Sequence, residues 1–208
     1  LVATFLAASA IDLELFIIPL ELCWFVTLVG LICAAVGPFV VSLDSIKMFD
    51  LFPYAGDSPK LAAVALGGAI GLIFSLIGLF TGIIKPSYEM ASLEEIDDID
   101  SAKEPKTEES EYNDRREVLR EVLFLLPVVI GAVAVQQITQ LPAISEKWAN
   151  FIQLPVISGL LGSLAGYMAG CAVVWATRIF GTLAFNKEAM GLGDVHLMGA
   201  AGAVIGAK

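Results

Sequence analysis

Long stretches without a charged residue dominate the chain. Leu22–Leu43, Leu61–Ile84 and Val122–Ser145 contain 22, 24 and 24 residues without Asp, Glu, Lys or Arg, and Trp148–Thr177 contains 30, with helix expected from near Pro155. A helix needs about 20 apolar residues to cross the hydrocarbon core of a bilayer. These four stretches therefore predict four complete membrane spans.

Two shorter apolar stretches, Leu1–Ile18 and Val195–Ala207, flank the four spans and predict two partial ones. None of the six alternates apolar and polar residues as a barrel strand does, and lipid offers no partner for backbone polar groups, so all six are expected to be helices. The predicted fold class is all-α, a polytopic transmembrane helical bundle with about six membrane segments. Because the chain begins at Leu1 and ends within an apolar run, we expect a fragment that lacks the N-terminal and C-terminal parts, with its first and last segments truncated.

Charged residues gather in one segment between the second and third spans. Of the 208 residues, 57% are hydrophobic and 16% are charged, and the segment from Lys85 to Glu121 alone holds six basic and thirteen acidic residues. A soluble domain as poor in charge as the remainder would expose large apolar patches, and a net charge of −10 is wrong for contacts with phosphates. Composition thus excludes an ordinary soluble domain and a nucleic-acid binder. We expect membrane helices over residues 1–84 and 121–208, and an acidic, mostly disordered loop over residues 85–120.

Basic residues near helix ends predict which side of the membrane each loop faces. The acidic loop, the Arg178–Asp194 stretch and the turn at Phe16–Glu21 fall on one side, and loops 44–60 and 139–153 fall on the other. The first side carries eight basic residues and the second carries three, so the first side is predicted to be cytoplasmic. The eight are Lys85, Lys103, Lys106, Arg115, Arg116, Arg120, Arg178 and Lys187, and the three are Lys47, Lys60 and Lys147.

Glycines four residues apart predict close helix packing, which we expect within the molecule rather than between two copies. This spacing occurs as Gly162-x-x-x-Gly166-x-x-x-Gly170, Gly78-x-x-x-Gly82 and Gly202-x-x-x-Gly206. No metal site is expected, since Cys23, Cys33 and Cys171 all lie in apolar stretches without a Cys-x-x-Cys pair and His196 is the one histidine of the chain.

Two aspartates carry the candidate chemistry. Asp12 follows Ala10-Ile11 near the end of the first apolar segment, and Asp194 lies within Gly191-Leu-Gly-Asp near the start of the last. By the number of crossings, both fall at the cytoplasmic face. A carboxylate in an apolar helix is costly and therefore a functional candidate. Alternatively, both mark the membrane interface, and Asp194 caps the helix that it precedes.

Together, two aspartates at one membrane face allow aspartyl protease chemistry. One carboxylate acts as a base and activates a water, while the other, protonated, polarises the scissile carbonyl. Two carboxyl groups that lie close together share their titration, because like charges cannot both ionise easily. Gly191 and Gly193 would let the backbone approach a substrate and turn sharply into the helix.

The two motifs resemble those of the type IV prepilin peptidases, membrane aspartyl proteases of pilus and type II secretion systems. The first motif is Ala10-Ile-Asp-Leu-Glu-Leu-Phe-Ile-Ile-Pro19, and the second is Glu188-Ala-Met-Gly-Leu-Gly-Asp-Val-His-Leu197. The resemblance implies an endopeptidase in the inner (plasma) membrane that removes the cytoplasmic leader of prepilin-like proteins. It implies no cofactor for proteolysis, although many members also N-methylate their product with S-adenosylmethionine. It implies that the catalytic pair is Asp12 and Asp194, supported by Glu188, Gly191, Gly193 and Pro19.

The chain departs from the family pattern at three places. Leu20 follows the proline of the first motif, where the family often has Asp, and His196 stands where the family often has Lys. The two aspartates are also far apart in the sequence, because the spans at 61–84 and 121–138 and the acidic loop form an additional hairpin. A hairpin adds an even number of crossings, so both aspartates remain on one face.

Two alternatives remain open. A presenilin-like intramembrane protease also uses a Gly-x-Gly-Asp motif, but its first aspartate usually follows Tyr, and here Ile11 precedes Asp12. A transporter or an inactive homologue would use the aspartates for protons or ions, and a pair too far apart to share a water would favour it.

Overall fold

The computed structural model describes residues 2–15, 18–41, 53–83, 114–185 and 190–206, and its regular elements are all helices. The acidic loop at 84–113 and the predicted disorder there lie outside the described residues. The helices are α1 (Val2–Leu15), α2 (Leu20–Val40), α4 (Pro59–Phe80), α6 (Asp114–Thr139), α7 (Pro142–Ile152), α8 (Pro155–Phe185) and α9 (Leu192–Ile205).

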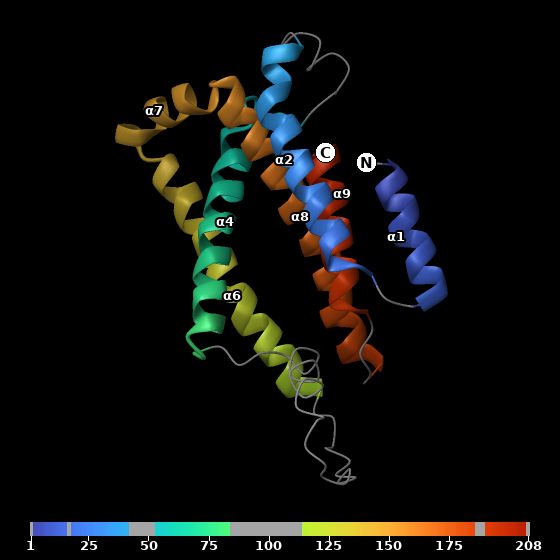
Figure 1. Ribbon diagram of the computed structural model, residues 1–208. Coiled ribbons are helices and arrows are strands. Elements are labelled where there is room, and N and C mark those ends of the chain that lie inside the picture. The colour runs from blue at the N-terminus through green and yellow to red at the C-terminus, as the bar shows by residue number, and fades with distance from the viewer. Residues whose placement is uncertain (1, 16–17, 42–52, 84–113, 186–189, 207–208) are drawn as a thin grey trace, which may run out of the picture.

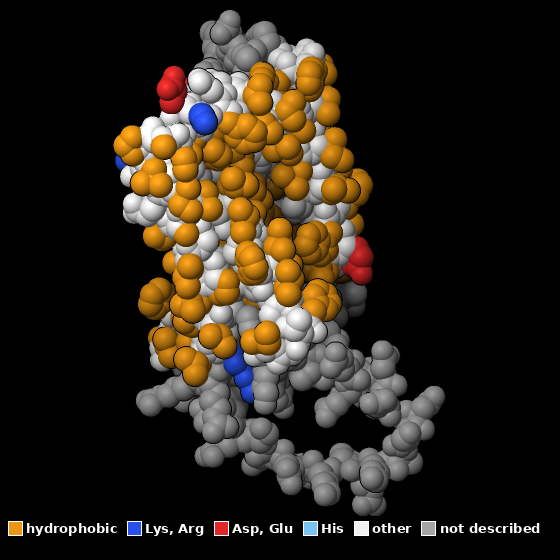
Figure 2. All heavy atoms as spheres, turned by 90° about the vertical axis from the view of Figure 1, so that its left-hand side faces the viewer, with side chains coloured by type: hydrophobic (Ala, Val, Ile, Leu, Met, Phe, Trp, Pro, Cys, Tyr) orange, Lys and Arg blue, Asp and Glu red, His pale blue; other side chains and the backbone are white. Residues whose placement is uncertain are grey.

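The predicted all-α fold is confirmed, and four helices, one overlapping each of the four predicted spans, are long and apolar enough to cross a membrane. They are α2, α4, the Val118–Thr139 part of α6, and α8, whereas α9 is apolar but shorter. Large apolar side chains face outward on them, and Phe80, for example, is 89% exposed. Figure 2 shows one such face, covered by hydrophobic side chains with few charges between them. This distribution, together with the helix lengths, indicates a membrane protein.

The helices pack in two sets. α4 packs along α6, while α8 packs along α9 and α2, and α4 also contacts α8 (Figure 1). Gly166 of α8 faces Gly202 of α9 so closely that a Cβ on either would collide with the backbone of the other. The expected role of the glycine spacing in packing within the molecule is therefore confirmed for α8 and α9, where close backbone contact maximises dispersion.

One glycine pair does not lie where the sequence predicted. α4 ends at Phe80, so Gly82 follows the helix with a φ of +74° and does not continue its packing face. Instead, Gly67 and Gly71 carry the same spacing within one turn of the middle of α4, and both lie against the backbone of α6 near Gly131 and Pro127. The hairpin therefore packs through a different glycine pair.

The connection predicted at 139–153 does join α6 to α8, but most of it forms a helix, α7, that the sequence did not predict. Pro142 begins this helix at a position where its missing N–H is not needed. Trp148 and Ile152 are buried against Ala55, Ala62 and neighbouring residues, and the Trp148 indole Nε1 donates to the Pro59 carbonyl at 3.0 Å. α7 thus covers the end of the bundle where α4 begins and α8 starts.

The described parts of the two sequence motifs both lie toward the opposite end of the bundle, away from α7 (Figure 1). In Figure 1, the end of α1 and the start of α2 lie toward the same end of the bundle as the end of α8 and the start of α9. α4 ends and α6 begins at this same end of the molecule.

Candidate functional site

The second motif forms the start of α9. Gly191 precedes the helix with extended dihedral angles (φ −71°, ψ 156°), and Asp194 is the third helical residue, half-buried in the first turn. The prediction that Asp194 could cap the helix is wrong, because Gly191 occupies the cap position and no side chain caps the helix there. A carboxylate in the first turn still interacts favourably with the helix dipole. Glu188, expected to support the site, lies outside the described residues.

The first motif forms the end of α1 and the turn into α2. Asp12 belongs to the last turn and a half of α1, and its side chain lies outside the described part of the structure. Pro19 precedes α2 with a φ of −65°, and its carbonyl accepts hydrogen bonds from the N–H groups of Leu22 (3.2 Å) and Cys23 (3.4 Å). Pro19 therefore precedes the first turn of α2, where its ring restricts the backbone to this angle.

The two motifs meet where Ile18 packs on Gly193. A Cβ built on Gly193 would lie 3.0 Å from the Ile18 Cβ, which is closer than ordinary van der Waals contact. Ile18 also packs against the buried cluster of Cys23, Val26 and Ala200. Residues 175 positions apart in the chain thus share one contact, and Gly193 permits it because it has no side chain.

A cavity of about 530 Å³ opens beside this junction, between the two sets of helices. Its wall is mostly apolar and includes Trp24 of α2, Phe124 of α6 and Trp175 of α8. Polar side chains also lie on the wall, among them Arg120, Glu121, Tyr167 and His196. The His196 ring lies 5.9 Å from the Trp24 ring between centroids, at an angle of 38°. Leu192 and Val195 line the cavity, and Asp194 lies between these two residues in the sequence.

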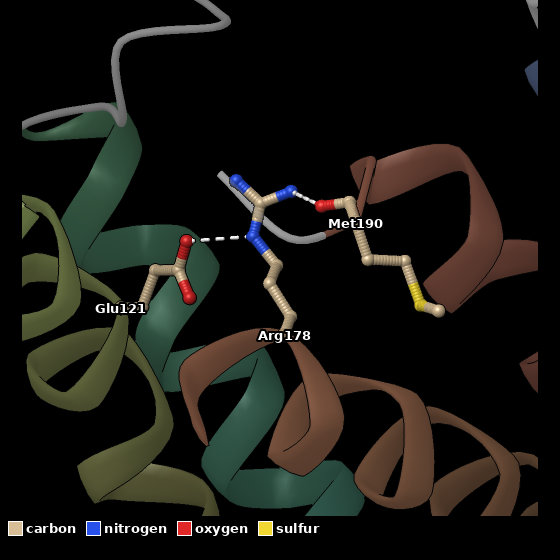
Figure 3. A network of polar contacts seen from close by, with 3 residues as sticks. All are labelled: Glu121, Arg178 and Met190. Atoms are coloured by element: carbon tan, nitrogen blue, oxygen red, sulfur yellow. Dashed lines mark hydrogen bonds and ion pairs between the residues drawn. The ribbon is translucent and has the colours of Figure 1, made fainter. Parts of the chain in front are cut away.

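A buried ion pair lies at the same end of the bundle, and sequence reasoning missed it. The Arg178 Nε of α8 donates to the Glu121 Oε1 of α6 at 2.8 Å, and the two residues are 4% and 8% exposed. The Arg178 Nη1 also donates to the carbonyl of Met190, the residue before Gly191 (Figure 3). The signal was Arg178 itself, which ends an apolar stretch and must find a partner when buried.

The cysteines contribute no cluster. Cys23 is buried and Cys33 and Cys171 are half-buried, all as free thiols. Within the described ranges, no group of three or more His, Cys, Asp or Glu residues gathers in a way that could hold a metal ion.

Comparisons of the chain with protein-family models, with curated proteins and with solved structures found no match.

Proposed function

We propose that the protein is a polytopic membrane aspartic endopeptidase of the prepilin peptidase type. Its substrates are prepilin-like proteins or type II secretion pseudopilins, and it removes their leader at the cytoplasmic face of the inner membrane. Asp12 and Asp194 are the catalytic pair, and Gly191, Gly193 and Pro19 shape the backbone around them.

The chemistry needs two carboxyl groups in different protonation states. The ionised carboxylate takes a proton from a water, the water attacks the scissile carbonyl, and the protonated carboxyl group donates to the carbonyl oxygen. The amide nitrogen then leaves with a proton, and the pair returns to its starting state. Neither step requires a metal or an organic cofactor.

The contact between Ile18 and Gly193 is the observation that carries the proposal. Ile18 is the next-to-last residue of the first motif and Gly193 directly precedes Asp194 in the second, so the two motif segments pack together although they are distant in the sequence. An unrelated pair of interface aspartates gives no reason for this packing.

The position of the cut tests the proposal against its protease alternative. Membranes with the full-length protein are incubated with a prepilin-like substrate, and the products are mapped by mass spectrometry, with membranes that lack the protein as the control. We expect one cut at the boundary between the leader and the apolar helix, after a glycine. A cut within the apolar helix would favour a presenilin-like protease, and an intact substrate would favour a transporter or an inactive homologue.

A further inference from the structure

We infer that Arg178 is a positioning residue for the Gly-Leu-Gly-Asp turn, and that Glu121 holds Arg178 in place. The inference deepens the proposed function and rests on it for its effect on cleavage. Arg178 does not touch the reacting atoms. It acts through the Met190 carbonyl on the backbone that leads into Asp194.

Few interactions within the Gly-Leu-Gly-Asp turn itself restrain its backbone. Gly191 and Gly193 together leave the backbone between Met190 and Asp194 with unusual conformational freedom. α9 also begins without a side-chain cap, so no local hydrogen bond from a side chain restrains this end of the helix. The turn must therefore be fixed by contacts with other elements.

Two such contacts lie on either side of the turn. Ile18 packs on Gly193, and the Arg178 guanidinium donates to the Met190 carbonyl. The guanidinium is planar, so its Nε and Nη1 point in fixed directions toward Glu121 and Met190 (Figure 3). Arg178 thus transmits the position of α6 to the start of α9.

The ion pair between Glu121 and Arg178 is buried, which restricts its geometry. Glu121 and Arg178 lie almost entirely out of solvent, where an unpaired charge is strongly unfavourable and a paired one keeps its geometry. Glu121 comes from α6, in the hairpin that separates the two aspartate motifs. The hairpin therefore supports the second motif.

The test compares two variants of the full-length protein in lipid nanodiscs. Arg178→Lys keeps a buried cation beside Glu121 but lacks the fork that reaches Met190. The double variant Arg178→Met with Glu121→Met removes both charges and retains apolar bulk, which keeps the fold stable. Lys147→Met, an exposed residue of α7, is the control.

We measure amide hydrogen exchange, thermal unfolding, and kcat and KM for a prepilin-like substrate. In both variants, exchange at residues 195–198, whose N–H groups pair with the carbonyls of residues 191–194 at the start of α9, should rise by about tenfold, while exchange in the middle of α8 and the unfolding temperature stay near wild type. The value of kcat should fall on the order of tenfold or more with KM little changed, because the turn is misplaced rather than the substrate site lost. Lys147→Met should change none of these.

Unchanged exchange at 195–198 in Arg178→Lys, or a rise spread equally over α8, would overturn the inference. The exchange measurement needs no substrate. If the wild-type protein cleaves nothing, the proposed function fails while the exchange result still decides whether Arg178 positions the turn.

Discussion

Gly193 is the residue at which the two motifs approach most tightly among the contacts described above. Its missing Cβ leaves room for Ile18, whose own Cβ is the nearest atom, while the Ile18 Cδ1 and Cγ1 lie 3.5 and 3.6 Å from the position of an added Cβ. Gly191 differs, because an added Cβ there would lie 3.9 Å from the nearest atom. A side chain would therefore be obstructed at Gly193 but would have room at Gly191.

A glycine swap tests this contact. Gly193→Ala should lower cleavage by roughly tenfold, because its Cβ pushes the turn away from Ile18. Adding Ile18→Gly should restore part of the activity, whereas adding Ile18→Ala should not, since Ala keeps the obstructing Cβ. Cleavage rates in membranes measure this, with Gly191→Ala expected to lose less than Gly193→Ala. Equal rescue by both second changes would contradict the account.

The buried ion pair between Glu121 and Arg178 should contribute to the stability of the protein. Glu121→Gln should lower the free energy of unfolding by about 3–5 kcal/mol, because it leaves the Arg178 charge buried without its anionic partner. Denaturation in mixed detergent micelles measures the change. Glu146→Gln on the exposed face of α7 is the matched control and should change stability little. A Glu121→Gln protein as stable as the control would disprove the pairing.

At the scale of elements, the packing of α8 on α9 depends on small side chains and one buried hydroxyl. Gly166 and Gly202 bring the two backbones together, and the Ser163 Oγ donates to the Ala203 carbonyl at 2.6 Å. α9 carries Asp194 in its first turn, so this packing also determines where Asp194 lies along the axis of α8.

Enlarging a glycine in this interface should separate the helices. Gly166→Leu should destabilise the protein by at least about 1–3 kcal/mol, the usual range for overpacking, and should reduce cleavage through displacement of α9. The control is Ala169→Leu, which adds bulk to an exposed position of the same helix. Unfolding and cleavage are measured on both variants, and similar behaviour of the two would refute the interface.

The sequence predicted those helices whose length and hydropathy alone are enough to identify them. The spans of α2, α4 and α8 follow from length and hydropathy alone, because lipid requires each to satisfy its own backbone. α7 escaped prediction, since Glu146 and Lys147 interrupt its 11 residues and Trp148 is buried by contact with the distant Pro59. Such an element depends on tertiary contacts that a local pattern does not contain.

At the scale of the whole molecule, the arrangement brings together residues that the sequence separates. The motifs themselves could be recognised locally, but the packing of Ile18 on Gly193 and the pairing of Glu121 with Arg178 span 175 and 57 positions. No periodicity or composition specifies such pairs. The candidate residues of the site are thus a prediction from local motifs, whereas the contacts of Gly193 and Met190 in the second motif emerged from the fold.

The proposed orientation predicts which ends of the bundle a polar reagent can reach. In a protein whose native cysteines are replaced, Ala184→Cys near the end of α8 should react with a membrane-impermeant maleimide only after the membrane is opened. Ala143→Cys in α7 should react in intact cells stripped of their outer membrane. The reverse pattern would place the aspartate motifs outside the cytoplasm and contradict the proposed function.

The cleavage of a prepilin-like substrate by aspartate variants tests the central claim most directly. The full-length protein carrying Asp12→Asn or Asp194→Asn is assayed in membranes at matched amounts, with Asp57→Asn, an exposed residue at the opposite end of the bundle, as the control. Each variant of the pair should lose cleavage by at least about a thousandfold, since neither carboxyl group alone can both activate water and polarise the carbonyl. The control should cleave as the wild type does. Retained cleavage in either Asp12→Asn or Asp194→Asn would contradict the account.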